Sequence, residues 1–69
     1  MNIFSERLKE LRKEKSMTLK EVATHLNMPL SSYANYEQGV REPSLSMLKQ
    51  LCDFYDVSAD YLIGRTDSY

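Results

Sequence analysis

Apolar residues recur every three or four positions along most of this 69-residue chain, which is the spacing of amphipathic helices. In the first such stretch, Phe4, Leu8 and Leu11 form a stripe with Ile3 and Arg12, and the charged residues between them point outward. No stretch shows the strict alternation that is typical of a half-buried strand. The spacing predicts five short helices, over residues 3–15, 19–26, 30–37, 45–55 and 59–63.

Helix start and stop signals separate these segments. Thr18 and Glu21 have the spacing of a capping box, in which the hydroxyl and the carboxylate each accept a hydrogen bond from an unpaired backbone N–H. Asn27 suits the left-handed residue that ends a helix. Pro29 suits the first turn of the next helix, where its missing N–H costs nothing. Further caps are expected at Ser44 and Ser58, and further stops at Gly39 and Gly64.

Together these segments predict an all-α fold, a compact bundle of five short helices with short connections. We expect one domain over residues 1–64 and a short, frayed C-terminal tail over residues 65–69. In the second half of the chain, the residues expected to face the core are Tyr33, Tyr36, Leu45, Leu48, Leu51, Cys52, Tyr55, Val57 and Leu62.

Residues 18–37 are the most informative stretch. Two short helices joined by a tight connection are the sequence form of a helix-turn-helix, which places its second helix in the major groove of DNA. The second helix, residues 30–37, contains no Lys or Arg. Charges that would bind the phosphate backbone must therefore lie elsewhere in the chain.

Positive charge is concentrated in the first part of the chain, although the net charge is −1. Residues 1–41 carry seven Lys or Arg against five Glu, whereas residues 42–69 carry two against five acidic residues. A polyanion would prefer the first part, with the acidic part facing away. The alternative is that these charges only solvate the outer faces of helices.

Composition argues against several other kinds of protein. Cys52 is the single cysteine, so neither an intrachain disulfide nor a zinc cluster is expected. The chain shows no secretory signal pattern and no apolar run long enough to span a membrane. We expect a cytoplasmic protein with no metal, no cofactor and no small-molecule ligand, in which Cys52 is an inert core thiol and His25 lies at the surface.

Five short motifs occur in a fixed order: R-L-K-E-L-R (7–12), M-T-L-K-E-V-A (17–23), Y-E-Q-G (36–39), R-E-P-S (41–44) and V-S-A-D-Y-L-I-G (57–64). In this order and spacing they resemble the Cro/CI-type helix-turn-helix family of phage and bacterial transcriptional regulators, also called the xenobiotic response element family. The resemblance covers roughly residues 5–64. It implies a five-helix, lambda-repressor-like fold, double-stranded DNA as partner, a palindromic operator and a homodimer.

The resemblance also assigns roles to individual positions. It makes helix 30–37 the recognition helix and pairs Arg12 with Glu37 in a structural ion pair. Ser32 is a borderline reader, because in the family this position packs near the residue that is Ala23 here. The implied base-reading residues are Leu30, Ser31, Ser32 and Asn35. The implied phosphate-binding residues are Thr18, Leu19, Tyr36, Gln38, Val40 and Arg41.

Two positions depart from the family pattern. Leu19 stands where the family usually has Gln, so its side chain cannot hydrogen-bond a phosphate. The recognition helix offers no Arg for bidentate contact with guanine. Asn35 can bind adenine N6 and N7, Ser31 is permissive, and Leu30 can pack on a thymine methyl group. We therefore expect recognition through A·T pairs and groove shape.

Aromatic residues admit both structural and functional interpretations. Tyr33 is expected in the core, and Tyr36 can bury its ring while its hydroxyl contacts phosphate. Phe54 lies beside an inward position, where it can be half exposed. An expected dimer patch consists of Phe54, Ala59, Tyr61 and Ile63.

The favoured hypothesis is a sequence-specific DNA-binding transcriptional regulator, a repressor without enzymatic activity. The alternative is a protein-interaction module on the same fold, antitoxin-like or an antirepressor, with weak or secondary DNA binding. The neutral recognition helix and Leu19 keep this alternative open. Because the sequence stops soon after residue 64, we expect no separate ligand-sensing domain.

A selection of binding sites from randomised DNA tests the expected recognition of A·T pairs. The selected half-site should be rich in A·T pairs, because helix 30–37 offers Asn, Ser and Leu but no Arg or Lys. A guanine-rich consensus would contradict this expectation.

Overall fold

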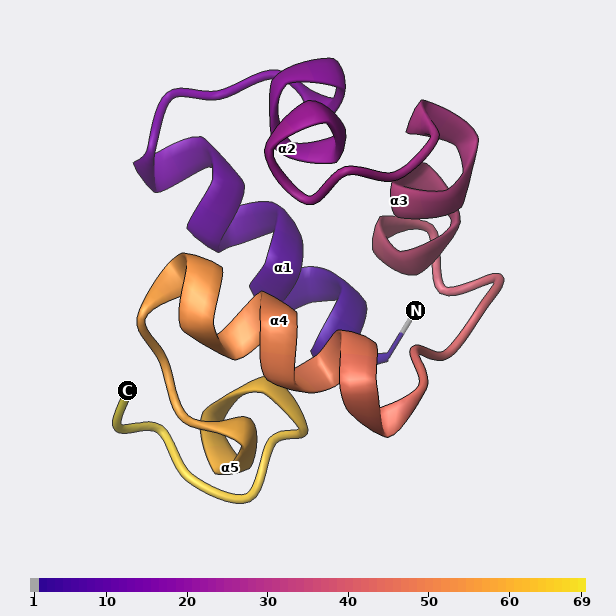
Figure 1. Ribbon diagram of the computed structural model, residues 1–69. Helices are drawn as coiled ribbons and strands as arrows, with labels where there is room; N and C mark the ends of the chain where they lie inside the picture. The colour runs from indigo at the N-terminus through magenta and orange to yellow at the C-terminus, as the bar shows by residue number, and fades with distance from the viewer. Residues whose placement is uncertain (1) are drawn as a thin grey trace.

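The computed structural model describes residues 2–69 and contains five α-helices, with no strand in that range. The helices are α1 (Ile3–Glu14), α2 (Leu19–His25), α3 (Leu30–Glu37), α4 (Leu45–Tyr55) and α5 (Ala59–Leu62). The all-α prediction is confirmed, and the expected bounds are right except that α1, α2 and α5 each end one residue earlier. Figure 1 shows α2 and α3 above α1, with α4 and α5 below it.

The helix ends follow the expected cap chemistry. The Thr18 N–H donates to Glu21 Oε1 at 2.8 Å, and the Glu21 N–H donates to Thr18 Oγ1 at 3.1 Å, which is a complete capping box. Ser44 and Ser58 also accept from the first turns of their helices, and Asn27 has a φ of 58°. Pro29 differs from the expectation, since it is the residue before α3 rather than part of its first turn.

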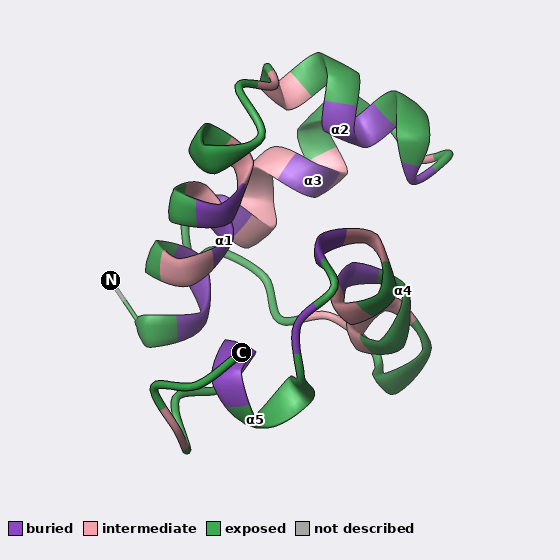
Figure 2. Ribbon diagram, turned by 90° about the vertical axis from the view of Figure 1, so that its left-hand side faces the viewer, coloured by how far each residue is buried: buried purple, intermediate pink, exposed green. Residues whose placement is uncertain are grey.

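The core lies where the inward faces of the helices meet (Figure 2). Leu8, Val22, Tyr33, Leu51 and Leu62 are completely buried. The hydroxyls of Tyr33 and Tyr55 share a buried hydrogen bond of 2.6 Å, which joins α3 to α4. Burial raises the pKa of Tyr55 to about 12, and burial together with the Tyr55 contact raises the pKa of Tyr33 still further.

Three residues expected to face the core are less buried than predicted. Leu45 is 85% exposed and Ile3 is 44% exposed. Each is the first residue of its helix, where neighbouring elements cover it incompletely, although the Ile3 side chain lies beside Gly64. Cys52 is only half buried, although desolvation, followed by the Asp53 charge, raises the pKa of its thiol.

The C-terminal tail is packed rather than frayed, which corrects the expectation from sequence. Arg7 of α1 stacks on the Tyr61 ring at 4.1 Å from its centroid and donates to the Thr66 carbonyl at 2.6 Å and to Asp67 at 2.8 Å. Tyr69 packs edge-on against Tyr61 with ring centroids 4.8 Å apart. No local signal in the tail predicts these contacts, because Arg7 lies far away in the sequence, in α1.

Across residues 2–69, no helix is long and apolar enough to cross a membrane. The same stretch of chain contains no group of three or more His, Cys, Asp or Glu side chains placed to hold a metal ion.

Replacing Tyr33 with Phe should destabilise the domain by about 1–3 kcal/mol, because the Tyr55 hydroxyl loses its buried partner. The difference in stability between the wild type and this variant should become smaller at high pH. An unfolded Tyr ionises near pH 10.0, whereas the folded pKa values are raised, so the wild-type stabilisation is complete below pH 10 and is lost as the pH rises through about 12. Urea unfolding at several pH values measures this, and a difference that stays constant from neutral to high pH would contradict it.

Candidate nucleic-acid interface

The α2–α3 unit places one helix face at the surface. Val22, Ala23 and Leu26 of the α2 segment are buried together with Tyr33 of α3. Between the helices, Asn27 adopts a left-handed conformation and the Met28 N–H donates to the Ala23 carbonyl at 3.0 Å. This tight connection leaves the outer side of α3 open to solvent, as in a helix-turn-helix (Figure 1).

The four expected base-reading residues all lie on the accessible part of α3. Ser31 is exposed, and Ser32 and Asn35 are half buried. The helix period puts these three on one side, opposite the buried Tyr33 and Glu37. Leu30 is 46% exposed and stands at the start of the helix. Ser31, Ser32 and Asn35 therefore form one surface, called here the reading face, and Leu30 stands beside it at the start of the helix, toward the side of Tyr33 and Glu37.

The start of α2 supplies two of the expected phosphate-binding residues. The Thr18 hydroxyl accepts the Glu21 N–H, so its own hydrogen remains free to donate. The Leu19 side chain packs against the core, so only its backbone N–H can reach a phosphate, and a first-turn N–H has no partner inside the helix. The hydrogen bonds from Thr18 lower the pKa of Glu21, which keeps a negative charge beside this site.

The loop after α3 has no free backbone donors between residues 38 and 41. The N–H groups of Val40 and Arg41 both donate to the Asn35 carbonyl, at 3.0 and 3.3 Å, and those of Gln38 and Gly39 donate to other carbonyls of α3. Hydrogen bonds to phosphate must come from the exposed Gln38 and Arg41 side chains. Val40 is 68% exposed but can offer only an apolar contact.

A contact not foreseen from the sequence fixes the end of α3. Ser5 is completely buried, and its hydroxyl donates to the Tyr36 carbonyl at 2.8 Å. A Cβ at Gly39 would lie 3.3 Å from Ser5 Oγ, so Gly39 leaves room for this contact. One feature of the sequence could have indicated this contact: Ser5 is a small polar residue at an inward position of the helix, three residues before Leu8. The Tyr36 ring is half buried against the core.

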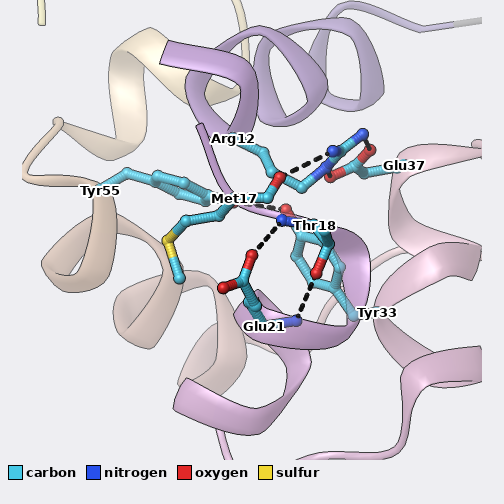
Figure 3. Close-up of polar contacts among 7 residues, drawn as sticks. All are labelled: Arg12, Met17, Thr18, Glu21, Tyr33, Glu37 and Tyr55. Atoms are coloured by element: carbon cyan, nitrogen blue, oxygen red, sulfur yellow. Dashed lines mark hydrogen bonds and ion pairs between the residues drawn. The ribbon is translucent and has the colours of Figure 1, made fainter. Parts of the chain in front are cut away.

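Arg12 and Glu37 form a two-pronged ion pair beneath α3 (Figure 3). Arg12 Nε donates to Glu37 Oε2 at 2.8 Å, and Nη2 donates to Oε1 at 3.0 Å. The remaining nitrogen, Nη1, donates to the Met17 carbonyl at 3.0 Å. Glu37 is 3% exposed, and its hydrogen bond is the main cause that raises the pKa of Arg12. The pair joins α1, the connection to α2 and the end of α3.

The four residues of the expected dimer patch differ in exposure, and their role in a dimer stays a prediction. Tyr61 is only 9% exposed, because Arg7 and Tyr69 cover it. Phe54 faces α2, with its ring centroid 5.8 Å from that of His25. Ile63 instead lines a groove with Leu48. Phe54 and Ile63 therefore lie against different parts of the molecule, and Ala59 is exposed one helical turn before Ile63.

Comparison with known proteins places this geometry among DNA-binding regulators. The Helix-turn-helix family model matches residues 8–62. The HTH-type transcriptional regulator AnsR of Bacillus subtilis is 47% identical over 60 residues, which cover 87% of this chain and 52% of AnsR. ImmR, an HTH-type transcriptional regulator of the same organism, is 40% identical over 64 residues, 93% of this chain and 50% of ImmR.

A phage protein is also similar. The cryptic phage CTXphi transcriptional repressor RstR of Vibrio cholerae is 29% identical over 66 residues, which cover 96% of this chain and 60% of RstR. The chain thus spans about half the length of the curated relatives it matches. The similarity covers all five helices of the domain.

Removing one partner of the buried pair tests how far α3 depends on it. Glu37→Ala should lower the free energy of unfolding by about 3–5 kcal/mol, because it leaves the Arg12 charge buried without a partner. For a domain of this size that corresponds to a fall of more than about 10 °C in melting temperature, measured by circular dichroism. Glu10→Ala removes the same charge from the exposed side of α1 and should change little. An unchanged melting temperature for Glu37→Ala would contradict the structural role of the pair.

Proposed function

Because this chain belongs to the Cro/CI-type helix-turn-helix family of transcriptional regulators, we propose that it is a sequence-specific DNA-binding repressor that acts as a homodimer on a palindromic operator. The observation that carries the proposal is the exposed reading face on α3, held from beneath by the buried Arg12–Glu37 pair. A rigid helix with an open polar face is what major-groove recognition requires.

In this proposal α3 lies in the major groove and Asn35 is the principal reader. Its side-chain amide can donate to adenine N7 and accept from adenine N6 at the same time. Ser31 and Ser32 add short, adaptable hydrogen bonds, and Leu30 packs on a thymine methyl group. Because all four side chains are neutral, discrimination comes from the shape of the hydrogen-bonding pattern rather than from charge.

Affinity comes from residues around the reading face. Arg41 is an exposed cation in the loop that follows α3, and Lys20 is an exposed cation near the start of α2. These side chains neutralise phosphates and release counterions. Thr18, the Leu19 N–H, Tyr36 and Gln38 add uncharged phosphate contacts that orient the helix without reading sequence.

In this proposal the protein acts in the cytoplasm and performs no catalysis. A second function, a protein-interaction module on the same fold, is favoured by one observation: α3 has no basic residue and exposes Leu30. A gel shift with the DNA that flanks its gene, at two salt concentrations, distinguishes the two. Binding that is specific and falls with salt supports the repressor, whereas no specific complex at low salt favours the interaction module.

Two alanine variants separate affinity from specificity. Arg41→Ala should weaken binding to operator and random DNA alike, and should reduce the slope of log K against log salt by about 0.9, because one phosphate contact is lost. Asn35→Ala should leave that slope unchanged and lose about 1–3 kcal/mol of discrimination between operator and random DNA. Fluorescence anisotropy with both duplexes measures each quantity.

Arg65→Ala is the matched control for the loss of a cation, since Arg65 is exposed in the C-terminal tail. It should leave unchanged both the salt slope and the discrimination between operator and random DNA. If Asn35→Ala keeps the wild-type ratio of operator to random binding, Asn35 is not the reader.

A further inference from the structure

The start of α1 and the end of α3 meet in a small polar joint, beside the connection that leads to α4 (Figure 1). Ser5, which is completely buried, lies at its centre, because its hydroxyl donates to the Tyr36 carbonyl at 2.8 Å. The Ser5 N–H donates to the Asn2 side chain, also at 2.8 Å. A Cβ at Gly39 would lie 3.3 Å from Ser5 Oγ and 3.7 Å from the Asn2 amide nitrogen. These four residues are called the α1–α3 joint.

The joint is one of two places where hydrogen bonds tie α1 to α3. Within residues 2–69, the other place is the Arg12–Glu37 pair. Ser5 and Arg12 lie two turns apart, which is about 10 Å along the axis of α1. One contact fixes a point, whereas two separated contacts also fix a direction. The ion pair holds a side chain of α3, and Ser5 holds its backbone.

The turn after α3 is attached to the same backbone. The Gly39 N–H donates to the Tyr36 carbonyl at 3.3 Å, and the N–H groups of the next two residues donate to the Asn35 carbonyl. The Ser5 hydroxyl is the closer of the two donors on the Tyr36 carbonyl. In the described part of the chain, no N–H of residues 42–44 makes a backbone hydrogen bond. The turn is therefore held at its α3 end, and Ser5 ties that end to α1.

We propose that Ser5 is a positioning residue for phosphate binding, which holds the turn so that the Arg41 guanidinium meets the DNA backbone. Arg41 is exposed and forms no ion pair within residues 2–69, so its backbone sets the region that the guanidinium can reach. A cation that is already in place loses less conformational freedom when it binds. The proposal rests on the proposed DNA-binding function and adds to it a buried residue that itself cannot touch DNA.

The chemistry of the joint separates this role from a general contribution to stability. Ser5→Ala removes the hydroxyl, but the Tyr36 carbonyl keeps the Gly39 N–H, so no buried polar group loses its last partner. Alanine lacks only that oxygen, so it still fits the inward side of α1. The change should therefore act on the turn more than on the fold as a whole.

Amide hydrogen exchange measured by NMR tests the joint without DNA. In Ser5→Ala the N–H groups of residues 39–41 should exchange about threefold to tenfold faster, because opening the turn no longer requires breaking a bond to α1. Ser58→Ala is the matched control, since it removes the hydroxyl that caps α5, and it should leave these three rates unchanged. Equal rates in Ser5→Ala and the wild type would overturn the proposal.

A double-mutant cycle with DNA tests whether Ser5 acts through Arg41. In fluorescence anisotropy with a random duplex, Ser5→Ala should weaken binding about threefold to tenfold and lower the salt slope, as Arg41→Ala does. Adding Arg41→Ala to Ser5→Ala should then weaken binding by less than Arg41→Ala does in the wild type. Lys20→Ala is the matched control. Lys20 lies near the start of α2, away from the joint, so its effect should multiply with that of Ser5→Ala.

The two measurements fail in different ways. If the effects of Ser5→Ala and Arg41→Ala multiply, Ser5 acts only on the stability of the fold and the proposal is wrong. Unchanged exchange rates would overturn the role of Ser5 but leave the proposed DNA binding intact, because that measurement contains no DNA. If the wild type forms no complex in the gel shift, the proposed function fails and the phosphate-positioning role fails with it, even where exchange in Ser5→Ala is faster.

Discussion

The buried ion pair between Arg12 and Glu37 is the interaction on which the rest of the structure depends. Charges are costly to bury unless both partners are fully hydrogen-bonded. Here two nitrogens of Arg12 donate hydrogen bonds to the two carboxylate oxygens of Glu37, and the third nitrogen donates to the Met17 carbonyl. Such a pair tolerates only one relative position of α1, the connection to α2 and α3. The orientation of the recognition helix is thereby set from below, without use of any residue on its outer side.

Asn35 connects the reading face to the loop that follows it. Its side chain belongs to the outer face of α3, while its carbonyl accepts the N–H groups of Val40 and Arg41. The backbone of the proposed reader, Asn35, therefore also holds the backbone of the nearby cation, Arg41. Ser5 and Gly39 support this arrangement by holding the Tyr36 carbonyl against α1. In the proposed function, specificity and affinity come from different side chains that share one hydrogen-bonded stretch of backbone.

Much of this could be predicted from the sequence, because local signals decide local structure. Apolar period and cap residues located all five helices, and the resemblance to the family indicated the Arg12–Glu37 pair. The incorrect predictions share one cause. The helix period shows which way a side chain points but not which neighbouring side chains it contacts. Leu45 points as expected and meets no neighbour, whereas the tail residues meet Arg7, more than fifty residues earlier. The burial of Tyr61, one of the residues of the expected dimer patch, depends on those same distant contacts.

The absence of Lys and Arg from α3 gives the proposed homodimer its importance. A single copy has few cations near the reading face and no Arg in α3, so its affinity for one half-site must be modest. In the proposed function, two copies on one palindrome add their binding free energies, and the second binds at the high effective concentration set by the first. Weak contacts between copies are then sufficient, since they need to act only when both half-sites are present. Modest affinity for one site would also limit binding to isolated half-sites, so in the proposed function selectivity for the palindrome follows from the absence of Lys and Arg in α3.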